Sequence, residues 1–261
     1  CCQHQGQASG QFNRALDNYL LDATYPLELD LVELQRFWRL PVQYFFNRRL
    51  KVTFEPPLPV MEDDEPFVLN GLESYQLRDA LLEVLLEHPD SPQALDDFTK
   101  QQRAQGKLPI GAFGELEFET NRVQAQDLAE KIAFLCQSPI DDQEIDLRFD
   151  VLGEGKCVHL TGWLTKYYQA GLVRYRSGAI RSQDYLAAWI DHLALAAMGK
   201  CQSTHVIGYD RKAGAQHLIY PPMPDAGQAK SLLAELVRLF YQGMTEPLAY
   251  FPKTALASIE A

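Results

Sequence analysis

The most regular hydrophobic pattern in the chain lies in the segment EIDLRFDV, residues 144–151. Ile145, Leu147, Phe149 and Val151 alternate with charged residues, so one face of the segment is apolar and the other is charged. Strict alternation with a period of two residues is typical of a strand that buries one face. Two further strands are expected in KCVHLTGWLTKYY and GLVRYR, which together with the first give a three-stranded meander.

The last two strands of this meander are predicted to form a hairpin. Two short β-rich runs, residues 162–168 and 172–176, flank the turn sequence Gln-Ala-Gly. Glycine between two such runs is a usual hairpin signal. A second strand pair is expected further along the chain, where THVIGYD and QHLIYPP lie on either side of a turn that contains Gly214.

Helical periodicity dominates the remaining segments. Residues 30–52 are predicted to form two helices, the first capped by Asp30 and the second starting near Pro41. The sequence Asn70-Gly-Leu-Glu73 resembles a capping box and is expected to open a helix that runs to about His88. Similar start and stop signals predict four more helices. Three of them span residues 90–106, 182–199 and 225–243, and one ends near Cys136.

This order of elements predicts an α/β or α+β fold with one mixed sheet flanked by helices. Within a domain of residues 28–261, residues 28–138 are expected to be mostly helical and residues 144–243 to form the strand–helix core. Residues 1–27 are interpreted as a linker or the remnant of a preceding domain, because the chain starts at Cys1 rather than at a methionine. The Pro-rich acidic segment 56–66 is predicted to be a loop.

The charge of the chain limits how it can contact nucleic acid. A net charge of −11 repels DNA, so any contact must come from a local basic patch or from neighbouring chains. In YFFNRRLK, residues 44–51, the cations Arg48, Arg49 and Lys51 stand beside aromatic residues and are candidate DNA-binding residues. Alternatively, the aromatic side chains lie in the core and the cations are solvated on the opposite helix face.

Two groups of residues have side chains of the types that bind metal ions. Glu144, Asp146 and Asp150 share one face of the first strand, although the neighbouring Arg148 favours a solvated edge strand. Four further side chains have the chemistry of zinc ligands, but their spacing matches no compact zinc finger; they are Cys157, His159, Cys201 and His205.

The five cysteines are widely spaced and odd in number, which argues against a disulfide framework and favours the reducing cytoplasm. No stretch approaches the roughly 18 uninterrupted apolar residues of a membrane span, so no membrane partner is expected.

Several long segments resemble the C-terminal region of the gamma chain of exodeoxyribonuclease V, the RecC family of the bacterial RecBCD helicase-nuclease. They include DLVELQRFWRLPVQYFFNRRLKV, LPIGAFGELEFE, LTGWLTKYYQAGLVRYR and YQGMTEPLAYFP, and they occur in the same order. The resemblance extends from about residue 28 to 252. It implies the fold of the PD-(D/E)xK nucleases with a degenerate active site.

The resemblance also implies where catalytic residues have been replaced. Thr165 stands where the first acid is expected, and Arg174 and Arg176 stand at the positions of the second acid and the lysine. The upstream histidine of active relatives falls near Glu117. Without carboxylates to hold Mg²⁺, no metal site and no catalysis are expected in this domain.

By resemblance, the chain is a non-catalytic scaffold in double-strand break repair by homologous recombination. Its expected partners are a beta (RecB-like) chain, an alpha (RecD-like) chain and DNA in the assembled complex, where the partner subunits use ATP and Mg²⁺. Two alternatives stay open. One is a metal-dependent nuclease that uses Glu144, Asp146 and Asp150, and the other is an interaction domain without DNA contact.

Overall fold

Helices form where the sequence predicts them in the computed structural model, which describes residues 27–52, 69–109, 111–153 and 155–260. Asp30 caps the first helix by accepting hydrogen bonds from the backbone of Val32 and Glu33, and Asn70 and Glu73 form the expected capping box. The helices are α1 (Leu31–Arg39), α2 (Pro41–Tyr44), the π-helical turn η1 (Phe45–Arg49), α3 (Gly71–Glu87), α4 (Pro92–Ala104), α5 (Ala112–Leu135), α6 (Ser182–Ala197), α7 (Ala226–Thr245) and α8 (Pro252–Glu260). In the described part of the chain, none is both long and apolar enough to cross a membrane.

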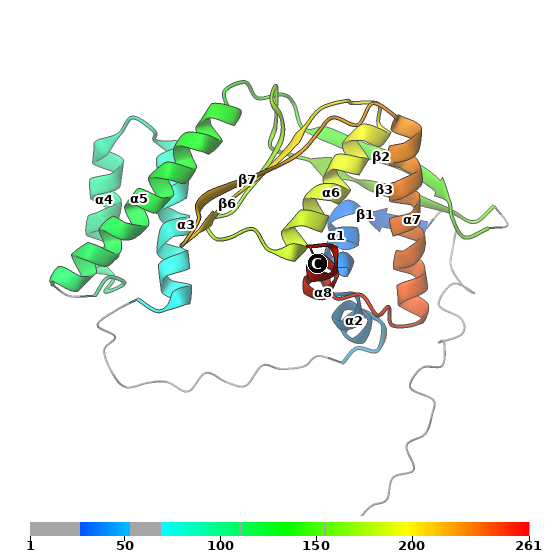
Figure 1. Cartoon of the computed structure of the whole chain (residues 1–261), viewed down its shortest axis with the longest axis horizontal. Helices are drawn as coiled ribbons and strands as arrows, with labels where there is room; N and C mark the ends of the chain where they lie inside the picture. The colour runs from blue at the N-terminus through cyan, green and yellow to red at the C-terminus, as the bar shows by residue number, and fades with distance from the viewer. Residues whose placement is uncertain (1–26, 53–68, 110, 154, 261) are drawn as a thin grey trace, which may run out of the picture.

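The strands form two mixed sheets (Figure 1). The first has the order β1–β3–β2, with the bounds Leu27–Asp30, Cys157–Leu164 and Gln143–Asp150. The second has the order β4–β5–β6–β7, with the bounds Tyr167–Tyr168, Gly171–Tyr175, Thr204–Asp210 and Gly214–Tyr220. In each sheet one pair is parallel, β1 with β3 and β5 with β6, and the other pairs are antiparallel.

The expectation of one mixed sheet is therefore wrong, and the cause lies between β3 and β4. The predicted strand 162–168 is interrupted, since β3 ends at Leu164 and β4 starts at Tyr167. Lys166 has a φ of 56°, which is left-handed backbone and does not continue a strand. The predicted meander is thus divided, with β2 and β3 in the first sheet and β5 in the second.

Two glycines of the hairpin region permit close backbone approaches. Gly171 has a φ of 122°, and a Cβ there would lie 2.1 Å from the carbonyl oxygen of Ser203. Gly162 in β3 lies under α1, where a Cβ would come within 2.9 Å of the Leu31 Cβ. The tight β4–β5 turn and the packing of α1 on β3 both depend on the missing side chain.

Two hydrophobic cores lie on opposite sides of the second sheet. Leu172 belongs to the core formed with α1, α6 and α7, whereas the next residue, Val173, belongs to the core formed with α3 and α5. Figure 1 shows the corresponding grouping, with α3, α4 and α5 at one end of the molecule and α1, α6 and α7 at the other. Because side chains alternate along a strand, Arg174 and Arg176 share the α6 side with Leu172.

Two expectations about the ends of the chain change. β1 begins at Leu27, within the segment expected to be a linker, and pairs in parallel with β3. α8 was not predicted at all. Most of the expected linker, together with the acidic segment 56–66, lies outside the described residues.

Candidate functional site

Arg174 of β5 is ion-paired with a buried carboxylate of α6. Its Nε donates to Asp191 Oδ2 at 2.6 Å, and the side chains of Arg174 and Asp191 are 23% and 7% exposed. The amide of Gln35, from α1, donates to the other carboxylate oxygen, Oδ1, at 2.5 Å. Burial raises the pKa of Asp191, while the Arg174 guanidinium and the Gln35 amide oppose that rise. Asp191 therefore links α1, α6 and β5 at one point.

The same arginine connects two of the positions at which nuclease residues were expected. Arg174 Nη1 donates to the backbone carbonyl oxygen of Thr165 at 2.7 Å. Thr165 follows β3 directly and its side chain is exposed. The structure thus brings Thr165 and Arg174 together, and the guanidinium lies between the residue 165 backbone and α6.

Arg176 makes a second ion pair with the same helix. Its Nη1 donates to Asp184 Oδ2 at 2.7 Å, and the guanidinium carbon lies 5.7 Å from the centre of the Tyr75 ring. Asp184 and Asp191 are seven residues apart, or about two turns of α6, so they share one helix face. Both arginines of the hairpin are therefore matched by carboxylates of α6.

Glu117, the fourth of these positions, lies on α5 and is half-buried. Its backbone carbonyl accepts a hydrogen bond from Asn121 Nδ2 at 2.9 Å. Among the described residues, no hydrogen bond or ion pair joins Glu117 to Thr165, Arg174 or Arg176. The structure does not bring it into this cluster.

The acids of EIDLRFDV lie on the exposed face of β2, which is an edge strand, so the predicted alternation is confirmed. Asp146 is 2.6 Å from His159 Nε2 on β3, and Glu28 of β1 is 3.2 Å from His159 Nδ1. Asp146 first, and then Glu28, raise the pKa of His159 above its ordinary value of 6.5. Asp146 thus takes part in a three-residue polar cluster across the first sheet.

The four candidate zinc ligands are dispersed. Cys157 and His159 lie on β3, Cys201 is exposed before β6, and His205 of β6 is hydrogen-bonded to His217 Nε2 and the Ala170 carbonyl, both at 3.0 Å. Within residues 27–52, 69–109, 111–153 and 155–260, no group of three or more His, Cys, Asp or Glu is placed to hold a metal ion.

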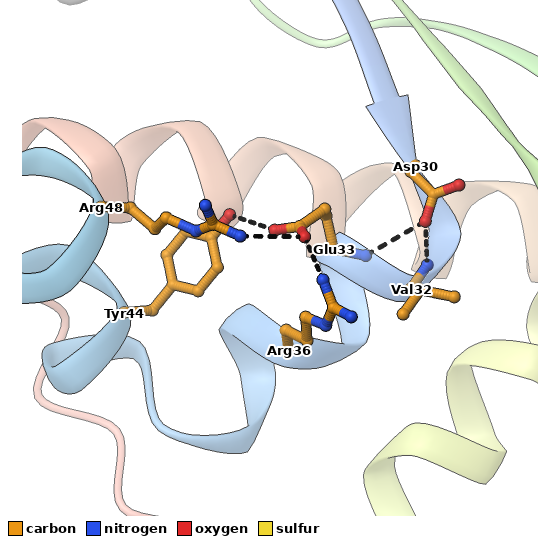
Figure 2. A network of polar contacts seen from close by, with 6 residues as sticks. All are labelled: Asp30, Val32, Glu33, Arg36, Tyr44 and Arg48. Atoms are coloured by element: carbon orange, nitrogen blue, oxygen red, sulfur yellow. Dashed lines mark hydrogen bonds and ion pairs between the residues drawn. The ribbon is translucent and has the colours of Figure 1, made fainter.

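A second candidate site lies where α1 meets α2 and η1 (Figure 2). Glu33 Oε1 accepts from Arg36 Nη1 at 2.5 Å and from Arg48 Nη2 at 3.2 Å, and Oε2 accepts from the Tyr44 hydroxyl at 2.7 Å. Burial opposes ionisation of Glu33, but these hydrogen bonds and cations together lower its pKa below the ordinary value of 4.5. One carboxylate therefore receives three converging donors.

This carboxylate faces a hollow of about 560 Å³ that all three candidate DNA-binding residues line. Arg48 and Lys51 are exposed and Arg49 is half-buried. Phe45 is only 4% exposed, so one aromatic residue does lie in the core, as the alternative interpretation expected. Tyr44, in contrast, lines the hollow with the cations, and we name this feature the basic hollow: Glu33, Tyr44, Arg48, Arg49, Lys51 and Met244.

Comparison with known proteins identifies the family. The family model described as the RecC C-terminal domain matches residues 26–261. The chain belongs to the RecC C-terminal domain family. The RecBCD enzyme subunit RecC of Escherichia coli (strain K12) is 35% identical over 249 residues, which is 95% of this chain and 20% of that protein.

Other RecC proteins show the same partial coverage. The RecBCD enzyme subunit RecC of Mycobacterium tuberculosis (strain ATCC 25618 / H37Rv) is 30% identical over 92% of this chain and 21% of its own length. That of Buchnera aphidicola subsp. Acyrthosiphon pisum (strain APS) is 26% identical over 85% of this chain and 19% of its own length. The chain spans about a fifth of the length of these relatives.

In this RecC-family chain, the residues that accompany the two hairpin arginines were not predicted from the sequence. Gln35 is far from β5 in sequence, whereas Asp184 and Asp191 are 8 and 17 residues from the arginines that they contact; the packing of α1 and α6 on β5 brings all three to it. A signal for Asp191 was nevertheless present. It is an acid within the apolar helical run AAWIDHLALAA, and a buried carboxylate requires a charged or hydrogen-bonding partner.

Proposed function

We propose that this chain is a non-catalytic, nuclease-like domain of a RecC subunit. In this role it is a scaffold for partner motor chains and guides DNA strands during double-strand break repair by homologous recombination. Family membership supports the assignment to RecC. The observation that carries the non-catalytic role is the Arg174–Asp191 ion pair beside the Thr165 carbonyl.

The chemistry of these side chains supports this role. Metal-dependent phosphodiester hydrolysis uses carboxylates that hold a divalent cation and orient the attacking water. A guanidinium stays protonated and has no acceptor atom, so Arg174 offers no metal ligand. Asp191, the carboxylate nearest to it, is already engaged by Arg174 and Gln35. We therefore propose that the hairpin acts as part of the scaffold.

We further propose that RecB-like and RecD-like chains are the protein partners and that DNA passes the domain in the assembled complex. The relatives are named as subunits of the RecBCD enzyme, which supports assembly with those chains. In this proposal ATP and Mg²⁺ are used by the partner chains, and this domain has no cofactor of its own.

Reconstitution tests the scaffold role. A full-length RecC subunit that carries this chain is compared with one truncated immediately before Leu27, each mixed with RecB-like and RecD-like chains. We expect the truncated subunit to lose at least one partner in size-exclusion chromatography. Retention of both partners would contradict the scaffold role. Photocrosslinking of DNA to the intact complex distinguishes the DNA-guiding scaffold from an interaction domain without DNA contact. The scaffold should crosslink to DNA through this domain, and the interaction domain should not.

A further inference from the structure

The basic hollow is the centre of a local reversal of charge. Three cations and one acid line it, a net charge of 3 − 1 = +2, in a chain whose overall charge is −11. The acid is Glu33, and its carboxylate lies among the cations rather than apart from them. Salt screens interactions between exposed charges that are more than about 8–10 Å apart. Acidic residues farther away than this therefore do not cancel the positive charge of the hollow.

The donors around Glu33 are those that bind a phosphate group. Two guanidinium groups and one phenol converge on the two oxygens of a single anion, and arginine is a preferred partner of carboxylate and phosphate alike. The side chains of Arg36 and Arg48 are 60% and 53% exposed. Both guanidinium groups are therefore accessible to a phosphate, which would draw on the N–H donors that Glu33 now engages.

Packing against the hydrophobic core fixes the position of Tyr44 in the basic hollow. The Tyr44 ring packs edge-on against Phe37 and Phe240, at centroid distances of 5.6 and 5.9 Å, and this fixes the direction of its hydroxyl. The Arg48 guanidinium carbon lies 5.9 Å from the centre of the Tyr44 ring.

Two backbone features accompany this arrangement. Arg48 and Arg49 end a π-helical turn, and Lys51 has a φ of 56°. Both are uncommon conformations that concentrate at functional sites.

We propose that the basic hollow binds a phosphodiester group of a DNA strand and that the Glu33 carboxylate competes internally for the same donors. The proposal rests on the proposed function, which supplies DNA to this domain. A hollow of about 560 Å³ is within the range of roughly 300–1,000 Å³ found for small-ligand sites. Because the lining cations bind phosphate oxygens, which are the same for every base, the contact is to the backbone and is independent of base sequence.

Fluorescence anisotropy of the whole chain with a short labelled single strand at low salt tests this site. The double variant Arg48→Ala, Lys51→Ala is compared with the control Arg122→Ala, Arg238→Ala. The control removes the same charge from two exposed pairs elsewhere, Arg122–Glu119 and Arg238–Glu235. We expect several-fold weaker binding only for the hollow variant. Its slope of log affinity against log salt should fall by roughly 1.4, about 0.7 for each lost phosphate contact.

A third variant, Glu33→Gln, tests the internal competition. The amide oxygen keeps an acceptor for Tyr44 while the negative charge is lost, so we expect several-fold tighter binding.

Three results would overturn the proposal: equal weakening of binding in the control variant, unchanged affinity of Glu33→Gln, or no binding by the unmodified chain. So would chemical-shift changes at the hollow with inorganic phosphate but not with the oligonucleotide. Matching thermal unfolding curves verify that the variants fold, and none of these readouts depends on DNA cleavage or subunit assembly.

Discussion

At the scale of single residues, the Arg174–Asp191 pair shows how this chain keeps a buried carboxylate in its interior. Asp191 is 7% exposed and is balanced by one guanidinium and one amide. We predict that Arg174→Ala lowers the free energy of unfolding by about 3 kcal/mol, because it leaves a buried carboxylate without its counter-charge. Urea denaturation measures this loss.

The control for this variant is Arg122→Ala, which removes an exposed i,i+3 pair with Glu119. Exposed pairs contribute about 0–1 kcal/mol, so little change is expected. Equal losses in the two variants would show that the Arg174 pair contributes no more than a surface contact.

His159 gives a pH-dependent prediction at the same scale. Its pKa is raised in the folded chain, so the folded state binds the proton more tightly than the unfolded state. The resulting stabilisation is complete below pH 6.5 and is lost as the pH rises through the raised pKa. NMR titration of Asp146→Asn should show the pKa of His159 falling toward 6.5, because Asp146 is the larger cause of the shift.

Asp150→Asn is the matched control for the titration, because Asp150 lies on the same exposed face of β2 but pairs with Cys157 in the strand register. It should leave the titration of His159 nearly unchanged. A fall of equal size in this control would mean that general charge, rather than the 2.6 Å contact of Asp146, raises the pKa of His159.

At the scale of elements, local signals were sufficient for most helices and for the 204–210 and 214–220 strand pair. Asp30, Asn70 and Asp225 act as helix caps as their sequence contexts predict, because a cap depends on residues within one turn. The short strand β1 carries little periodicity and is defined by its partner β3, which is about 130 residues away.

The break at Lys166 was equally hard to predict. No proline or glycine marks this position, and the left-handed φ is seen only in the structure. The sites differ in the same way. The cations of the basic hollow are neighbours in sequence and were identified there, whereas Met244 joins the hollow, and Gln35 reaches Asp191 beside Arg174, through tertiary packing.

Gly171 provides the prediction at the element scale. In Gly171→Ala, the added Cβ meets the Ser203 backbone 2.1 Å away and the φ of 122° is unfavourable for alanine, so the hairpin must shift. We expect a loss of about 2 kcal/mol in thermal or urea unfolding.

Gly71→Ala, in the first turn of α3, is the matched control for Gly171→Ala. It meets nothing within 4 Å and should leave stability unchanged or raise it by up to about 1 kcal/mol. A Gly171→Ala chain as stable as this control would contradict the close approach of β5 to residue 203.

At the scale of the whole molecule, the hairpin arginines and the basic hollow lie on the side of the core formed with α1, α6 and α7. The hairpin arginines face α6 on one side of the second sheet, and the core of α3 and α5 lies on the other. The basic hollow lies at the α1–α2 end, among the elements that Figure 1 groups with α7. Under the proposed function, an acidic chain with a basic hollow would contact DNA at a defined place rather than along its whole surface.

The most direct test of the non-catalytic role is a cleavage assay of the whole chain on labelled linear DNA. The reactions contain Mg²⁺ or Mn²⁺, with a chelator control and the variant Asp146→Ala. We predict no metal-dependent cleavage by either chain, because the hairpin positions carry Thr165 and the ion-paired Arg174. Chelator-sensitive cleavage that Asp146→Ala abolishes would contradict this role and assign catalysis to the acids of β2.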